Sequence, residues 1–236
     1  EVGIPGQRAL RAARVMIVGL GGLGCPALQY LAAAGVGHLL LVDNDVVSLS
    51  NLHRQTLYGQ NQIGKKKAQA AAEWVARLNP EIQTTVIAER FTDLNAIALA
   101  EPADILLDCT DNFPARYAMN DACAKVGIPW VYGSIARFEG QVAVFNAARK
   151  DQAESNVKGG ARSLNYRDVF PQEPGPGEIQ NCEELGVLGA LAGIIGSLQA
   201  LEVLKYLLKF EGLLMDQLLT YDGLNHRMIQ FQLRPT

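Results

Sequence analysis

The sequence lacks the cysteine pattern of a disulfide scaffold or of a zinc site. Its 236 residues include four cysteines, Cys25, Cys109, Cys123 and Cys182, and none of them forms a C-x-x-C pair. Disulfide frameworks and structural zinc sites both depend on characteristic spacings of several cysteines. Free thiols in a reducing compartment are the simplest interpretation, and we expect a cytoplasmic protein.

A long apolar run, a secretory leader and an excess of positive charge are also missing. The best candidate for a membrane span, residues 187–201, is short and rich in Gly and Ala, so we expect a buried helix there and no membrane partner. Lys and Arg number 21 against 24 Asp and Glu, which gives a net charge of −3. That balance argues against nucleic acid as the main partner. The chain begins at Glu1 without Met, which favours a processed or trimmed N-terminus.

The composition is that of a folded protein, with 49% hydrophobic and 19% charged residues. Over residues 14–135 the predicted strands and helices alternate, which is typical of a Rossmann-like, doubly wound α/β sheet that is mostly parallel. We interpret residues 1–236 as a single domain. Its nucleotide-binding core is 14–135, and residues 136–236 add a crossover loop, helices and a closing hairpin.

The second part of the chain has a different pattern. Residues 140–146 alternate with the period of a half-exposed strand, and residues 147–177 form a long polar loop. We expect one long broken helix or two helices over 187–210. An antiparallel hairpin of 218–222 with 228–233 would extend the sheet at its C-terminal side.

The most informative motif is the run Arg14-Val-Met-Ile-Val-Gly-Leu-Gly-Gly-Leu-Gly24. An apolar strand that leads into glycines at this spacing predicts a nucleotide-binding turn before a helix. Gly19 permits the tight turn, Gly21 lets a phosphate approach the backbone, and Gly24 lets the helix pack close to the strand. The N-terminus of that helix favours negative charge.

Polar residues after the next strand narrow the choice of nucleotide. Asp43 follows the loop by about twenty residues, where a carboxylate can bind ribose hydroxyls. These features alone fit NAD, FAD or ATP. An NAD enzyme would normally continue into an ordinary helix, but here Asp45, Asn51 and Arg54 follow instead. Arginine can bind phosphate with two hydrogen bonds, and Lys67 opens the next predicted helix within reach of the same phosphates.

The two lysines next to Lys67 and one further segment of the sequence need an interpretation. We interpret Lys65 and Lys66 as solvated surface charges. The segment Asp108-Cys-Thr-Asp-Asn112 follows another strand, at the edge where open α/β sheets bind ligands. Asp111 can hold Mg²⁺ against nucleotide phosphates. The alternative is that Asp111 caps the helix that follows.

These blocks together resemble the ThiF/MoeB/HesA family of adenylyltransferases, which are related to ubiquitin-activating enzymes. The resemblance rests on the glycine run, on Ser50-Asn-Leu-x-Arg-Gln55 after Asp43, on Cys109-Thr-Asp-Asn112 and on the run 186–200. It covers nearly the whole chain, from residue 3 to residue 233. It implies MgATP-dependent adenylation of the C-terminal glycine of a small ubiquitin-like protein that ends in Gly-Gly. In bacteria that protein is usually a sulfur carrier for thiamine or molybdenum cofactor synthesis.

The resemblance also implies roles for individual residues. Gly22 and Asp43 would contact the nucleotide, Asn51 and Arg54 would hold phosphates, Lys67 would reach the α-phosphate region, and Asp111 would bind Mg²⁺. The complete set of candidate nucleotide ligands is Gly19, Gly21, Gly22, Gly24, Asp43, Asp45, Asn51, Arg54, Lys67, Asp111 and Asn112.

Four further expectations follow from the family pattern. Cys182 lies where members often have a cysteine that joins the carrier covalently or passes sulfur, although a structural free cysteine is the alternative. Many members bind zinc through two C-x-x-C pairs, but Asn165-Tyr-Arg-Asp168 stands in place of the first and there is no second, so we predict no zinc. The family is homodimeric, and the apolar region 187–204 would contribute to the interface. Members also carry an N-terminal arginine that reaches the partner subunit's site, and residues 1–7 contain no match.

Other functions remain open at this point. A related activating enzyme would act on another acyl group, a peptide C-terminus or a modified tRNA nucleoside. An NAD-dependent oxidoreductase would explain the glycine loop and Asp43 but not Arg54, Lys67 and Asp111. A silent binding protein would keep the fold without the reaction.

Overall fold

The computed structural model describes residues 2–147, 163–175 and 186–235. Its strands are β1 (Arg14–Val18), β2 (His38–Val42), β3 (Gln83–Ile87), β4 (Ile105–Asp108), β5 (Trp130–Ala136), β6 (Glu139–Phe145), β7 (Gln217–Asp222) and β8 (Arg227–Gln232). Its helices are α1 (Gly3–Ala12), α2 (Gly24–Ala33), α3 (Lys67–Leu78), α4 (Ala96–Ala100), α5 (Phe113–Val126), α6 (Tyr166–Val169) and α8 (Gly189–Leu207), with short 3₁₀ turns at Leu49–Asn51 and Gln60–Gln62.

These strands form one sheet in the order β3-β2-β1-β4-β5-β6-β7-β8. The first five are parallel, whereas β6, β7 and β8 are joined in antiparallel pairs. The predicted fold class is therefore confirmed, including its antiparallel C-terminal extension. The chain order reverses between β1 and β4, and open α/β sheets bind ligands outside the carboxyl ends of the strands at such a point.

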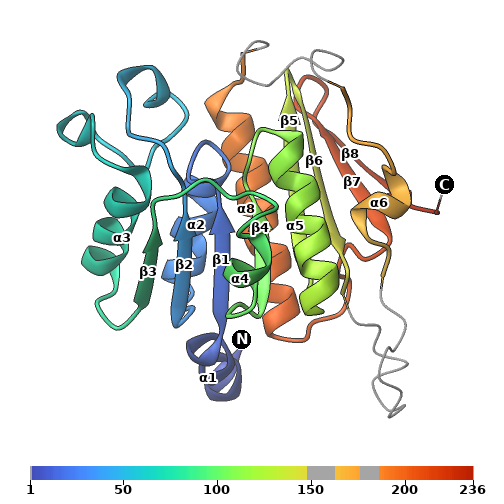
Figure 1. Cartoon of the computed structure of the whole chain (residues 1–236), viewed down its shortest axis with the longest axis horizontal. Coiled ribbons are helices and arrows are strands. Elements are labelled where there is room, and N and C mark those ends of the chain that lie inside the picture. The colour runs from blue at the N-terminus through green and yellow to red at the C-terminus, as the bar shows by residue number, and fades with distance from the viewer. Residues whose placement is uncertain (1, 148–162, 176–185, 236) are drawn as a thin grey trace.

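Helices cover both faces of the sheet (Figure 1). One apolar core joins α2, α3 and α8 to one face, and a second core joins α4, α5 and α6 to the other. Because both faces are covered, Val15–Val18 of β1 are all buried, as are Leu39–Val42 of β2. The upper edge in Figure 1, where the parallel strands end, is left for loops.

Two expectations about the second part of the chain need correction. The strand β6 is mostly buried rather than half-exposed, because it lies inside the sheet between β5 and β7. Within the segment 187–210, residues Gly189–Leu207 form one continuous helix, α8, of 19 residues, where a broken helix or two helices were expected. By length and composition alone, α8 could cross a membrane, whereas the shorter apolar run 187–201 did not predict a helix of this length. In the structure it packs against α2, β5 and β6.

The long loop 147–177 is described only at its two ends. Residues 163–175 include α6, whose N-terminus is capped by the side chain of Asn165, and Asp168 accepts a hydrogen bond from the Asn165 backbone. Tyr166 is buried among aromatic side chains of α5, β5 and β6. The segment that stands in place of the first zinc pair is thus a short capped helix held by aromatic packing.

Two glycines of α8 give a matched test of its packing. A Cβ on Gly196 would lie 2.3 Å from the Leu23 carbonyl oxygen and 2.6 Å from Cγ of Pro26, whereas a Cβ on Gly193 would meet nothing within 4 Å. We expect Gly196→Ala to lower the free energy of unfolding by about 1–3 kcal/mol through overpacking. Gly193→Ala should raise it by about 0.5–1 kcal/mol through helix propensity. Urea unfolding of both variants checks the prediction, and equal shifts would contradict it.

Candidate functional site

A cavity of about 630 Å³ lies at the carboxyl ends of the parallel strands. Its wall includes most of the predicted nucleotide ligands, namely Gly19, Gly21, Gly22, Asp43, Asp45, Asn51, Arg54, Lys67, Asp111 and Asn112. Gly24 lies just behind the wall, at the start of α2. These ten candidates line one cavity although they lie up to 93 positions apart in the sequence, from Gly19 to Asn112. Cys182 lies outside the described residues.

The glycines of the first turn have separate structural reasons. Gly19 has a φ of +91°, and a Cβ there would lie 2.5 Å from the Cys109 carbonyl oxygen. A Cβ on Gly24 would lie 2.1 Å from the Gly19 carbonyl oxygen, so α2 packs directly on the turn. At Gly21 the nearest atom would be Nε2 of Gln55, at 3.5 Å. The backbone at Gly21 is therefore open to the cavity, as a phosphate-binding turn requires.

Asp43 holds the turn and the following loop together. Its Oδ2 accepts a hydrogen bond from the Leu20 backbone N–H at 2.7 Å, and its Oδ1 accepts one from the Asp45 N–H at 2.8 Å. Burial raises the pKa of Asp43 above its ordinary value, although both N–H donors and the charge of Lys67 oppose that rise. Carboxylate oxygens accept more than one hydrogen bond each, so ribose hydroxyls can still be bound.

The predicted cations lie on the same wall. Nζ of Lys67 is 3.0 Å from Oδ2 of Asp45, and the lysine is almost fully buried while the Asp45 side chain is 62% exposed. The backbone N–H groups of Arg54 and Gln55 both donate to the Asn51 carbonyl, which fixes Arg54 in a tight turn. The turn thus presents one guanidinium and α3 presents one ammonium to the cavity.

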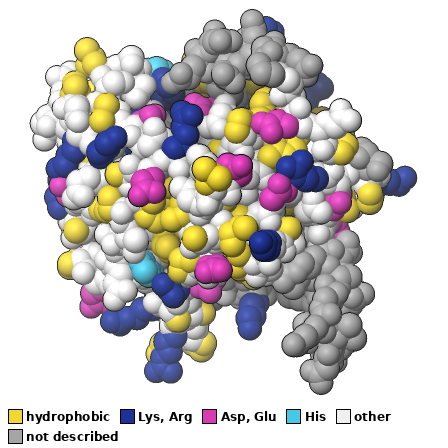
Figure 2. Space-filling model, viewed as in Figure 1, with side chains coloured by type: hydrophobic (Ala, Val, Ile, Leu, Met, Phe, Trp, Pro, Cys, Tyr) yellow, Lys and Arg dark blue, Asp and Glu magenta, His cyan; other side chains and the backbone are white. Residues whose placement is uncertain are grey.

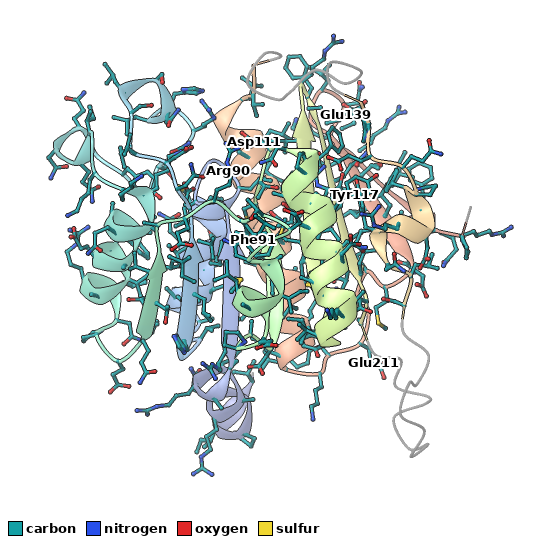
Figure 3. All side chains as sticks on the ribbon, in the orientation of Figure 1. Arg90, Phe91, Asp111, Tyr117, Glu139 and Glu211 are labelled. Atoms are coloured by element: carbon teal, nitrogen blue, oxygen red, sulfur yellow. The ribbon has the colours of Figure 1, made fainter. Side chains whose placement is uncertain are left out.

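Asp111 and Asn112 have distinct places at the start of α5. Oδ1 of Asn112 accepts the Ala115 N–H at 3.0 Å, so the helix cap belongs to Asn112 and not to Asp111. The exposed carboxylate of Asp111 has one weak contact, at 3.5 Å, with Nδ2 of Asn112. Figure 3 labels Asp111 near the loops above the sheet, together with Arg90 from the loop after β3. A carboxylate in this position is available to a cation.

A family model described as the ThiF family matches residues 1–236, which is the entire chain. The chain belongs to the ThiF family.

Among relatives of this ThiF-family chain is the "Adenylyltransferase and sulfurtransferase MOCS3" of Anopheles gambiae. It is 42% identical over 235 residues, covering 100% of this chain but only 50% of the relative, so the chain spans half of that protein's length. The "Sulfur carrier protein adenylyltransferase" of Thermus thermophilus is 44% identical over 224 residues, which cover 95% of this chain and 80% of the relative.

A crystal structure of Escherichia coli MccB with ATP has the same fold, with a TM-score of 0.79. The sequences are 19% identical, and the match covers 98% of this chain and 67% of that one. At this identity the likeness establishes the fold of the ThiF-family chain and leaves the roles of its residues to the geometry of its own site.

An ion pair that sequence reasoning missed lies beside the cavity, where Arg116 lines the wall and Asp108 lies behind it. Nε of Arg116 donates to Oδ2 of Asp108 at 2.8 Å, and both side chains are almost fully buried. The guanidinium also lies over the ring of Tyr132, 4.8 Å from its centroid. Burial alone would lower the pKa of Arg116, but the Asp108 carboxylate and neighbouring tyrosines raise it above its ordinary value. The signal in the sequence was a buried strand that ends in Asp108, because such a carboxylate needs a counter-ion.

The cysteines near the turn are packing residues in this structure. Burial raises the pKa of Cys25 to about 12, despite a hydrogen bond to the Leu57 backbone and the charge of Lys67. Cys109 and Cys123 are likewise buried, and burial raises the pKa of each. A reactive cysteine needs a lowered pKa and access to solvent, so these three buried cysteines are suited to packing.

Proposed function

We propose that this chain is an adenylyltransferase domain that uses MgATP to adenylate the C-terminal glycine of a small ubiquitin-like sulfur-carrier protein. One observation carries the proposal. The open glycine turn, the cations Arg54 and Lys67 and the exposed carboxylate of Asp111 all face one cavity of about 630 Å³. The names of the relatives support the same reaction. We also propose that the protein is cytoplasmic.

The residues present fit a magnesium nucleotide. The backbone at Gly21 is free of close side-chain contact except for one amide, so a phosphate can approach it. Asp43 would bind the ribose, Asn51 and Arg54 the phosphates, and Asp111 the Mg²⁺ ion. When bound, Mg²⁺ would neutralise charge on the phosphate oxygens.

The chemistry needs charge stabilisation and no protein nucleophile. A carboxylate oxygen of the carrier attacks the α-phosphorus of ATP and forms a new oxygen–phosphorus bond. The bond from that phosphorus to the β-phosphate oxygen breaks, and pyrophosphate leaves with the electron pair. Negative charge grows on the oxygens that Lys67 and Arg54 face, so fixed cations there lower the barrier. Cys182 would act only in a later covalent or sulfur-transfer step.

The antiparallel part of the sheet offers a docking surface for the carrier. Met228, Ile229 and Phe231 on the edge strand β8 are each about half-exposed. Edge strands and exposed apolar patches are common protein-binding surfaces. The turn after β7 is bonded to the tip of the β5–β6 hairpin, where the Gly223 N–H donates to the Phe138 carbonyl. That hairpin leads from the docking surface to Ala136 in the cavity wall.

A second copy of the chain is the other proposed partner. The outward side of α8 includes exposed Ile194 and Leu201, and Tyr30 of the adjoining α2 is also exposed. An apolar surface of this kind supports a homodimer. We do not propose nucleic acid as a partner, because basic and acidic side chains are interspersed over the face of the molecule that Figure 2 shows.

The test is ATP–pyrophosphate exchange with Mg²⁺ against a panel of small ubiquitin-like proteins that end in Gly-Gly. Exchange with one member would identify both the reaction and the carrier. Exchange with no member would favour another acyl substrate or a silent binding protein. Thermal shifts with MgATP and with NAD separate the oxidoreductase alternative, because a ligand stabilises the native state that binds it.

We also propose that the domain holds no structural zinc. Within the described residues no three His, Cys, Asp or Glu side chains form a group suited to a metal ion. Elemental analysis of the purified protein should give far less than one zinc per chain. One tightly bound zinc per chain would overturn the proposal.

A further inference from the structure

A buried tyrosine lies directly behind the glycine turn. Tyr58 is 6% exposed and belongs to the apolar core, and it is absent from the cavity wall. Its hydroxyl donates to the Leu20 carbonyl at 2.9 Å, and the Lys67 carbonyl lies 3.5 Å from the same hydroxyl oxygen. Burial raises the pKa of this hydroxyl above its ordinary value, so it stays protonated and remains a donor. Tyr58 therefore links the glycine turn to the first residue of α3.

The hydrogen bonds around Leu20 fix the directions of two successive peptide groups. The Leu20 N–H donates to Oδ2 of Asp43 at 2.7 Å, which fixes the peptide group before Leu20. The Leu20 carbonyl accepts the Tyr58 hydroxyl at 2.9 Å and, more weakly, the Cys25 thiol at 3.6 Å. Both of these donors are buried, so the peptide group after Leu20 is held from the interior of the protein.

The direction of the Leu20 carbonyl decides where the Gly21 N–H points. The peptide bonds are trans, and in a planar trans peptide the N–H points opposite to the carbonyl. Because the Leu20 carbonyl points at Tyr58 behind the wall, the Gly21 N–H points away from Tyr58, to the side on which Gly21 lines the cavity. Within the described part of the chain this N–H has no acceptor. A backbone donor held in this way is suited to a phosphate oxygen.

Tyr58 also belongs to the turn that carries Arg54. The Arg54 N–H donates to the Asn51 carbonyl, and the Tyr58 N–H donates to the Gln55 carbonyl. One short segment thus sends Arg54 to the cavity wall and Tyr58 into the core behind it. The tyrosine therefore contacts or adjoins all three elements that supply groups for phosphate, namely the glycine turn, the turn of Arg54 and the start of α3.

We propose that Tyr58 is a positioning residue for phosphate binding, whose hydroxyl holds the peptide group between Leu20 and Gly21 so that the Gly21 N–H faces the nucleotide. Tyr58 itself touches no ligand. Without the hydroxyl, this peptide group can rotate about its two flanking bonds, and the direction of the donor is lost although the ring still fills the core. The inference rests on the proposed nucleotide site and names a residue outside that site on which its geometry depends.

Removal of the hydroxyl alone tests the inference. Tyr58→Phe keeps the ring in the core, and the dissociation constants of MgATP and of magnesium tripolyphosphate should both rise about three- to tenfold, as expected when one hydrogen bond is lost. Isothermal titration of the full chain measures both constants. The two factors should be equal, because Tyr58 acts on the phosphate donor and not on the base or the ribose. A rise for MgATP without a rise for tripolyphosphate would overturn the inference.

Tyr117 on α5, which Figure 3 labels, supplies the matched control. It is 3% exposed and absent from the cavity wall, and its hydroxyl also faces backbone carbonyls, those of Phe170 at 2.9 Å and Gln172 at 2.7 Å. Tyr58→Phe and Tyr117→Phe should each lower the melting temperature by roughly 2–4 °C. Only Tyr58→Phe should weaken the binding of MgATP and tripolyphosphate. Unchanged binding in Tyr58→Phe, or an equal loss of binding in Tyr117→Phe, would show that the Tyr58 hydroxyl is merely structural.

The same titrations separate this inference from the proposed function. An unmodified protein that binds neither MgATP nor tripolyphosphate would overturn both. Binding in the unmodified protein that is matched by Tyr58→Phe would overturn the role of Tyr58 alone.

Discussion

Alanine at Lys67 or at Arg54 should lower carrier-dependent ATP–pyrophosphate exchange by about 10²–10³-fold, the range expected when one preorganised charge-stabilising group is lost. Lys67 is almost fully buried beside the exposed carboxylate of Asp45, so its charge acts in a medium that screens it weakly. In water the same ammonium would contribute far less. Both cations line the cavity, and the proposed reaction would place growing negative charge there, on the α-phosphate and on the leaving pyrophosphate.

The neighbouring lysine is the control for Lys67. Lys65 is 38% exposed and pairs with Glu73 on α3, and it is absent from the cavity wall. Lys65→Ala should change exchange by less than about twofold, because exposed ion pairs contribute little. Melting curves for all three variants show whether lost exchange reflects lost folding. Near-normal exchange in both Lys67→Ala and Arg54→Ala would refute catalysis by this pair of cations.

The fold was predictable because its signals are local. The apolar runs at β1 and β2 read as buried strands because helices cover both faces of a parallel sheet. The glycines at 19, 21 and 24 each carry a physical reason that spacing reveals, namely a positive φ, an open backbone and a close helix approach. The boundary of α8 was harder, since an apolar helix rich in glycine resembles two short ones until its partners α2, β5 and β6 are known.

The candidate site was predictable for residues that follow strand ends. Asp43 comes directly after β2 and Asp111 comes three residues after the end of β4, and parallel strands bring such positions to one edge. Arg116 escaped because its role depends on tertiary pairing: it neutralises the buried carboxylate of Asp108. A pattern of residue types does not reveal which polar side chains pair after folding.

Replacing Arg116 with methionine should lower the free energy of unfolding by about 3–5 kcal/mol, because it leaves Asp108 buried without its counter-ion. For a chain of this size the melting temperature would fall by roughly 10 °C. The surface pair Arg167–Asp121 is the matched control. It is joined by two hydrogen bonds of 2.7 and 2.8 Å but is 42% and 54% exposed, so Arg167→Met should cost less than about 1 kcal/mol.

The loss of Arg116 should also reach the candidate site. Oδ1 of Asp108 accepts the N–H and the hydroxyl of Thr110, and Arg116 holds the other oxygen of the same carboxylate. These bonds fix the turn that carries Asp111, so without Arg116 the affinity for MgATP should fall along with the stability. The double variant Asp108→Asn with Arg116→Met removes both charges and should recover part of the stability. Equal melting temperatures for Arg116→Met and Arg167→Met would show that burial does not make the inner pair important.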